Sequence, residues 1–234
     1  MGKIRIISKS PRVFQDREEA GRLLGHELAD YRGKKAVVTG VLRGGIIVAR
    51  EVARELDAEL DVVLSRKLRT PGQPELAMGS IGEDGQVFLN DAVVREFGID
   101  KASIDQEKAH QLEEIARRRA LIRRVFTKIP LTGRIVIITD DGVATGATTQ
   151  AAIWAVCQEK PQYVLAAIPV GSEDSIARLA DDVDEMVCLC TPPFFAAVGQ
   201  FYRYFEQVDD EDVLNILKAE RERKKVDRSS NQEG

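Results

Sequence analysis

The chain has little of several features that define common protein classes. It contains three cysteines, an odd number that fits no complete disulfide framework. Free thiols in a reducing cytoplasm are therefore the expectation. No apolar run approaches the ~18 residues that a membrane-spanning helix needs, and the N-terminus lacks the apolar segment of a secretory signal. We accordingly expect a cytoplasmic protein that does not enter a membrane.

Histidine is also scarce. His26 and His110 both fall on predicted amphipathic helices, which argues against a Ser-His-Asp hydrolase or a metal hydrolase. Cys188 and Cys190 have no histidine nearby in the sequence and form a poor zinc motif. The formal net charge is −4 and the sequence pI is about 5.5, so overall charge does not attract nucleic acid.

What the sequence does contain is a repeated alternation of apolar strands and helices. The predicted strands are residues 36–41, 60–65, 135–139, 164–170 and 185–190. The predicted helices are residues 16–29, 45–56, 147–157 and 172–179. Such repeats predict an α/β fold, with a parallel twisted sheet flanked by helices. Ligands bind beyond the carboxyl ends of the strands in such sheets, so the loops there are the candidate sites.

Two insertions and a polar tail interrupt this pattern. Residues 70–90 are rich in glycine and proline and predict a mobile hairpin or loop. Residues 103–127 predict one long charged helix with five arginines, namely Arg117, Arg118, Arg119, Arg123 and Arg124. That helix is either a solvated face paired with neighbouring glutamates or a nucleic-acid surface. Residues 222–234 are almost wholly charged or polar, which predicts a disordered tail.

The most informative loop follows the apolar run 135–139. Its sequence is Asp140-Asp141-Gly142-Val143-Ala144-Thr145-Gly146-Ala147-Thr148, and it leads into the next predicted helix. The N–H groups at a helix start favour an anion. Two adjacent carboxylates accept hydrogen bonds from hydroxyls or hold a hydrated divalent cation. A ribose with vicinal hydroxyls and a 5′-phosphate is a ligand that uses both surfaces.

This loop resembles the phosphoribosyl-pyrophosphate (PRPP) motif of type I phosphoribosyltransferases, in which an apolar strand precedes acid-Asp-x-x-x-Thr-Gly-x-Thr. The resemblance implies that the whole segment 140–148 binds PRPP. Asp140 and Asp141 would hold the ribose hydroxyls or waters on Mg²⁺, and the backbone amides of residues 143–147 with the Thr145 and Thr148 hydroxyls would hold the 5′-phosphate. The alternative is an ordinary strand-to-helix turn, which needs no acid pair before Thr-Gly-x-Thr.

Two basic segments lie at other strand ends. Arg43-Gly44-Gly45 resembles the pyrophosphate loop of the family, in which several relatives have a non-proline cis peptide; the corresponding bond here is Leu42–Arg43. Arg66 and Lys67 resemble the start of a loop that covers PRPP in related enzymes, although a solvated basic edge is the alternative. The resemblance implies that Arg43, Arg66, Lys67 and Asp141 form the catalytic group.

Aromatic residues gather between residues 191 and 205, beyond the last predicted strand. The resemblance places there, at about residues 190–208, a hood that grips the acceptor base. Phe194 or Phe195 would stack on that base, a contact that contributes ~1–3 kcal/mol. A second small core or a dimer surface is the alternative use of these rings.

The resemblance covers most of residues 12–216, with an insertion at about 70–128. It implies a pentosyltransferase that moves 5-phosphoribosyl from PRPP to a nitrogenous base or related acceptor, releases pyrophosphate and uses Mg²⁺. Ala144 stands where 6-oxopurine salvage enzymes have an aspartate, which argues against hypoxanthine or guanine as the acceptor. A PRPP- or nucleotide-sensing regulator and a hydrolase of a phosphoribosyl compound stay open, as does a homodimer.

Overall fold

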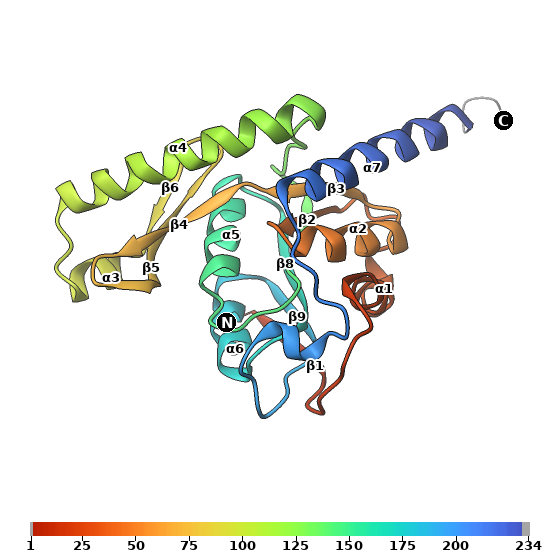
Figure 1. Ribbon diagram of the computed structural model, residues 1–234, viewed down its shortest axis with the longest axis horizontal. Helices are drawn as coiled ribbons and strands as arrows, with labels where there is room; N and C mark the ends of the chain where they lie inside the picture. Colours follow the sequence, from red (N-terminus) through yellow and green to blue (C-terminus); the bar gives the residue numbers. More distant parts are fainter. Residues whose placement is uncertain (1, 231–234) are drawn as a thin grey trace.

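A six-stranded parallel sheet forms the centre of the molecule (Figure 1). The computed structural model describes residues 2–230, without the side chains of Glu75 and residues 225–230. The strands are β1 (Lys3–Ser8), β2 (Val37–Val41), β3 (Glu59–Val63), β7 (Ile135–Thr139), β8 (Tyr163–Val170) and β9 (Glu185–Cys190). Their order across the sheet is β1-β9-β8-β7-β2-β3, and every neighbouring pair is parallel. All six carboxyl ends therefore lie at one edge.

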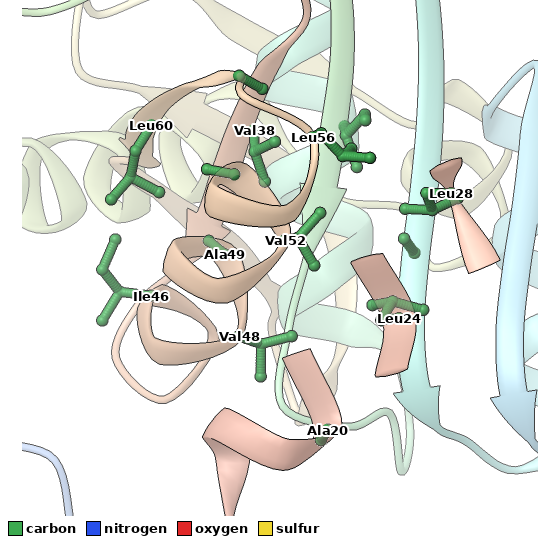
Figure 2. Close-up of a cluster of buried hydrophobic side chains, with 14 of the residues drawn as sticks. Ala20, Leu24, Leu28, Val38, Ile46, Val48, Ala49, Val52, Leu56 and Leu60 are labelled. Carbon is green, nitrogen blue, oxygen red and sulfur yellow. The ribbon is translucent and has the colours of Figure 1, made fainter. Parts of the chain in front are cut away.

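Helices pack on both faces of this sheet. One hydrophobic core contains residues of α1 (Arg17–Glu27), α2 (Gly45–Glu55) and α7 (Asp210–Ser230). The other contains residues of α5 (Ala147–Gln158) and α6 (Glu173–Leu179). Adjacent strand residues point to opposite faces, so Val38 joins the first core and Val37 the second. Figure 2 shows the first core, where Leu24 of α1 and valines of α2 meet strand residues.

The chain order reverses between β2 and β7, which is the place where doubly wound sheets bind ligands. From β2 the chain runs outward to β3, whereas β7, β8 and β9 follow on the other side. The helix after β2 packs on one face and the helix after β7 on the other. The loops that end these two strands therefore border one crevice.

The predicted α/β pattern is confirmed, with element ends displaced by one or two residues. The Asp16 carboxylate caps α1 by accepting the amide hydrogen of Glu19 at 2.8 Å. The helix ends at Glu27, and a short 3₁₀ turn, η1 (Ala29–Tyr31), follows. Two further 3₁₀ turns are η2 (Ala180–Asp182) and η3 (Val198–Phe201). The edge strand β1 is an addition that the sequence pattern did not predict.

The insertion forms a second, antiparallel sheet beside a long helix (Figure 1). Its elements are β4 (Ser65–Thr70), β5 (Gln73–Gly82), β6 (Val87–Leu89), α3 (Asp91–Glu96) and α4 (Lys101–Val125). The predicted hairpin is confirmed, but the alternative of a plain loop is wrong. Leu68, Met78 and Ile81 of the hairpin form a small core with Ile115 of α4, which gives these glycine-rich strands an apolar partner.

The sequence predicted disorder from residue 222, and the described part of this tail is helical in the structure. Helix α7 continues to Ser230, and residues 231–234 lie outside the described residues. Three contacts hold its middle against the domain: Arg54 pairs with the buried Glu220, Arg221 donates to the Val125 carbonyl, and Lys224 donates to the Ala58 carbonyl. Composition alone did not indicate these tertiary contacts. Within residues 2–230, none of the helices has the length and apolarity required to cross a bilayer.

Candidate functional site

The loop between β7 and α5 has the geometry of an anion cradle. The carbonyl of Ala144 accepts a hydrogen bond from Ser175 at 2.7 Å, and that of Thr145 accepts one from Arg178 at 2.8 Å. Because N–H and C=O point in opposite directions across a trans peptide, the amides of Thr145 and Gly146 point away from α6. The next amides, in the first turn of α5, lack intrahelical acceptors.

Gly146 makes this turn possible. It precedes α5 with φ of 77°, a left-handed conformation that side chains disfavour. Thr145 and Thr148 are both exposed beside it, so their hydroxyls remain accessible. The predicted threonine positions therefore surround the turn as the motif requires.

Val143 differs from its expected role. Its amide donates to the Val170 carbonyl at 2.9 Å, and its side chain is buried in the second core. The amide thus extends the sheet toward β8 and is not available to a phosphate. The predicted cradle of residues 143–147 is corrected to begin after Val143.

Asp140 is held by its own loop. One carboxylate oxygen accepts the Thr149 hydroxyl at 2.9 Å, and the other accepts the Asp141 amide at 2.9 Å. Burial and the neighbouring Asp141 charge raise the pKa of Asp140 above its usual range. A cation bound beside these two adjacent carboxyls would favour their ionised forms and lower their pKa values.

Asp141 has a partner that the sequence pattern did not indicate. Its carboxylate accepts a hydrogen bond from Arg17 Nε at 2.7 Å, and both side chains are largely buried. Burial raises the pKa of Asp141, and the guanidinium of Arg17 opposes that rise. Arg17 also donates to the Glu206 carbonyl at 2.9 Å and lies 3.8 Å from the Phe205 ring centroid. The acid is therefore linked through Arg17 to the C-terminal part of the predicted hood.

The Arg-Gly-Gly turn packs directly on the acid pair. A Cβ at Gly44 would lie 1.9 Å from Asp141 Oδ2, and a Cβ at Gly45 would lie 2.8 Å from the Thr139 carbonyl oxygen. The Leu42–Arg43 peptide is cis, as the resemblance implied. The predicted pyrophosphate loop and PRPP loop thus touch across the β2–β7 crevice.

Arg66 and Lys67 lie on β4, beside the ends of β2 and β3. Both are half-buried, and together with Leu42 and Thr148 they line a pocket of about 120 Å³. Arg66 Nε donates to Gln111 Oε1 at 3.0 Å. The pocket therefore brings the basic strand next to both predicted loops.

The aromatic segment divides into packed and exposed rings. Phe195 lies 5.0 Å from Phe201 between ring centroids, and Tyr202 stacks on Phe205 at 5.1 Å. Tyr202 also donates its hydroxyl to the Asp141 carbonyl. Phe194 is 86% exposed. Of the two predicted base-stacking residues, Phe194 has the open face, whereas Phe195 packs against the hood itself.

The acid pair suits a magnesium ion that is shared with a ligand. Among the described residues there is no cluster of three or more His, Cys, Asp or Glu side chains that could enclose a metal. Mg²⁺ commonly uses one or two carboxylates together with water and substrate phosphates. Asp140 and Asp141 supply that smaller donor set. Cys157, Cys188 and Cys190 are free thiols.

Comparison with known proteins agrees with this geometry. The family model for the phosphoribosyl transferase domain matches residues 14–206. Proteins of two Mycobacterium tuberculosis strains, CDC 1551 and H37Rv, named provisionally as phosphoribosyl transferases, are each 50% identical over 206 residues. These matches cover 88% of this chain and 46% of each relative, so the chain spans about half the length of these relatives.

A solved structure shows the same architecture. The crystal structure of TT1426 from Thermus thermophilus is 44% identical, with a TM-score of 0.84, and the alignment covers 88% of this chain and 98% of that one. The parallel sheet flanked by helices is a phosphoribosyltransferase fold. The chain belongs to the phosphoribosyl transferase domain family.

Proposed function

We propose that the protein transfers 5-phosphoribosyl from PRPP to a nitrogenous base or a related nitrogen acceptor and releases pyrophosphate. One observation carries this proposal: the acid pair, the amide-lined turn and the Arg-Gly-Gly turn meet at the β2–β7 crevice. A sugar bearing phosphate at one end and pyrophosphate at the other matches these three surfaces. Family membership supports the same class of reaction.

Each surface has a role in binding. The amides of Thr145 to Thr148 and the threonine hydroxyls hold the 5′-phosphate at the start of α5. Asp140 and Asp141 accept hydrogen bonds from the ribose hydroxyls. Arg43 and the amides of the glycine turn bind the pyrophosphate, assisted by Arg66 and Lys67. Phe194 stacks on the acceptor base.

The reaction itself requires positioning and charge stabilisation. The bond between C1′ and the pyrophosphate oxygen breaks as a nitrogen of the acceptor attacks C1′, and the acceptor loses one proton. Negative charge develops on the pyrophosphate, where the cations of the two basic segments stabilise it. Holding both reactants in line supplies a large share of the rate, so no nucleophilic side chain is needed.

Mg²⁺ fits this site as a cofactor shared with PRPP, with Asp140 and Asp141 as the residues that would hold it or its waters. When bound, the ion neutralises phosphate charge and helps to orient the leaving group. The protein's own groups meanwhile orient the ribose and exclude water from C1′.

A pyrophosphate-release assay with PRPP, Mg²⁺ and a panel of purine and pyrimidine bases tests the proposal. We expect base-dependent release from the wild type and at least a tenfold lower rate from Asp141→Asn. The exposed Asp181→Asn is the matched control and should retain the wild-type rate. Binding of PRPP without turnover on any base would instead support a regulator, and release without added base would support a hydrolase.

A further inference from the structure

The five arginines of α4 have three different environments. Arg123 is held by Asp61 at 2.7 Å and by Glu83 at 2.8 Å, and Arg117 pairs with Glu114 and Asp210 at 3.6 Å. Arg119 and Arg124 are exposed. The remaining one, Arg118, lines the pocket beside the pyrophosphate loop. The helix is thus neither a uniform solvated face nor a continuous basic surface.

Arg118 belongs to the buried face of α4. Gln111, Ile115, Arg118 and Ile122 are spaced by four, three and four residues, which places them on one side of the helix. Gln111 is 1% exposed, Ile115 3% and Ile122 5%. A cation in this row is unfavourable unless an opposite charge or hydrogen-bond acceptors compensate its lost hydration.

One donor of Arg118 receives no such compensation over the part of the chain that the structure describes. Arg118 Nε is buried without a hydrogen-bond partner there. The pocket is lined by Arg66, Lys67 and Arg69 as well as Arg118, and its described lining contains no carboxylate. Burial and the charge of Arg118 lower the pKa of Arg66, and the charges of Glu114 and Glu107 offset this only in part. Two guanidiniums that repel each other in a partly buried pocket form a site for an anion.

The pocket lies where a polyphosphate can reach it. Leu42 of the pyrophosphate loop and Thr148 of the 5′-phosphate turn are among its lining residues. Gln111 accepts from Arg66 and donates to Glu107 at 2.9 Å, which holds the Arg66 guanidinium at the pocket. At the far end of α4, the Arg123 ion pairs and Ile122 fix the helix to the main domain. The helix therefore forms a fixed wall of the crevice.

We propose that Arg118 of the inserted helix, together with Arg66 of β4, binds the pyrophosphate group of PRPP and the pyrophosphate that is released. This inference rests on the proposed function for the identity of the whole ligand. The anion site itself requires only a diphosphate. The inserted helix thereby supplies a phosphate ligand from outside the central sheet, in addition to the Arg-Gly-Gly turn.

Isothermal titration with inorganic pyrophosphate, PRPP and ribose 5-phosphate tests this role in the full chain. For Arg118→Gln we expect at least tenfold weaker binding of pyrophosphate and PRPP, equivalent to about 1.4 kcal/mol. Ribose 5-phosphate, which lacks the diphosphate, should bind as it does to the wild type. Arg119→Gln, an exposed neighbour on the same helix, is the matched control and should leave all three affinities unchanged.

Thermal unfolding separates a ligand role from a structural one. Because Arg118 Nε is buried without a partner among the described residues, Arg118→Gln should keep or raise the midpoint temperature in the absence of ligand. Gln111→Glu gives a second test, since a carboxylate of nearly the same shape beside Arg66 should weaken pyrophosphate binding without removing either arginine. Unchanged pyrophosphate affinity in both variants, or an equal loss of ribose 5-phosphate affinity, would overturn the inference.

These outcomes are distinct from failure of the proposed function. Pyrophosphate binding that depends on Arg118, without turnover on any base, would reject the transferase and retain the anion site. If the wild type is a base-dependent transferase and Arg118→Gln binds pyrophosphate normally, only the proposed anion site at Arg118 is rejected.

Discussion

Arg17 and Asp141, 124 residues apart in the sequence, form a largely buried ion pair at 2.7 Å. The pair connects the start of α1 with the acid that the proposed function assigns to ribose binding. Arg17 also lies against Phe205 at 3.8 Å and donates to the Glu206 carbonyl. One guanidinium therefore couples the α1 terminus, the predicted PRPP loop and the C-terminal part of the predicted hood.

Arg17→Met should destabilise the protein in a pH-dependent manner. Removing one partner of a buried pair leaves the other charge uncompensated, a loss of about 3–5 kcal/mol when that charge persists. The pKa of Asp141 is already raised by burial and should rise further without Arg17. The native variant then binds a proton that the unfolded chain releases, so its stability falls as pH rises through that window.

Urea unfolding at several pH values between 5 and 8 measures this effect. The control is Arg22→Met, on the same helix, whose side chain is 46% exposed and should change stability by less than about 0.5 kcal/mol. A loss of stability in Arg17→Met that does not vary with pH would contradict the expected rise in the pKa of Asp141.

Gly44→Ala should disturb the acid pair without adding a charge. The new Cβ would lie 1.9 Å from Asp141 Oδ2 and 2.9 Å from Arg17 Nε, so the ion pair must move. We expect a loss of about 1–3 kcal/mol in stability and at least tenfold weaker PRPP binding. Gly82→Ala is the comparison, because its closest contact is a flexible Asp84 side chain at 3.1 Å. Urea unfolding and PRPP titration of both variants measure these effects. An unchanged PRPP affinity in Gly44→Ala would contradict the prediction.

Binding of Mg²⁺-PRPP should strengthen as pH rises. Burial and the Asp141 charge raise the pKa of Asp140, whereas hydroxyl and cation binding favour its ionised form. Between the ordinary and the raised pKa the native protein holds a proton that the unfolded chain has lost, so this carboxyl contributes less stability as pH rises. Ligand affinity should increase over the same window, with a proton released on binding.

Titration in buffers of different ionisation enthalpy at pH 6 to 9 measures that proton. Asp140→Asn should bind more weakly and lose most of the pH dependence. A wild-type affinity that is flat across the range would show that Asp140 is already ionised before ligand binds.

The sequence predicted the central sheet well because buried parallel strands are continuous apolar runs. β7 has four buried residues out of five, and the run 135–139 was recognisable without tertiary information. β1 was missed because it is an edge strand of alternating character, with Lys3 and Arg5 both paired to Glu185 of the neighbouring strand. The hairpin was only half recognised because its glycines are typical of loops, whereas its strands are stabilised by packing on α4 and α5.

The sequence indicated those parts of the candidate site whose residues lie close together along the chain. The acid pair and the glycine turns follow strands within a few residues, so a linear motif describes them. Arg17 could not be found in this way, because its partner Asp141 is brought near only by the fold. Arg118 left a detectable signal, the helical spacing of Gln111, Ile115, Arg118 and Ile122, but only the structure shows that this face is buried.

Equilibrium titration of PRPP with and without Mg²⁺, on the wild type and on Asp141→Asn, tests the central claim most directly. The account predicts Mg²⁺-dependent binding by the wild type and an affinity at least tenfold lower in the variant, a difference of about 1.4 kcal/mol, with the fold intact by circular dichroism. The exposed Asp181→Asn should bind as the wild type does. Equal PRPP affinity in Asp141→Asn and the wild type would contradict the account.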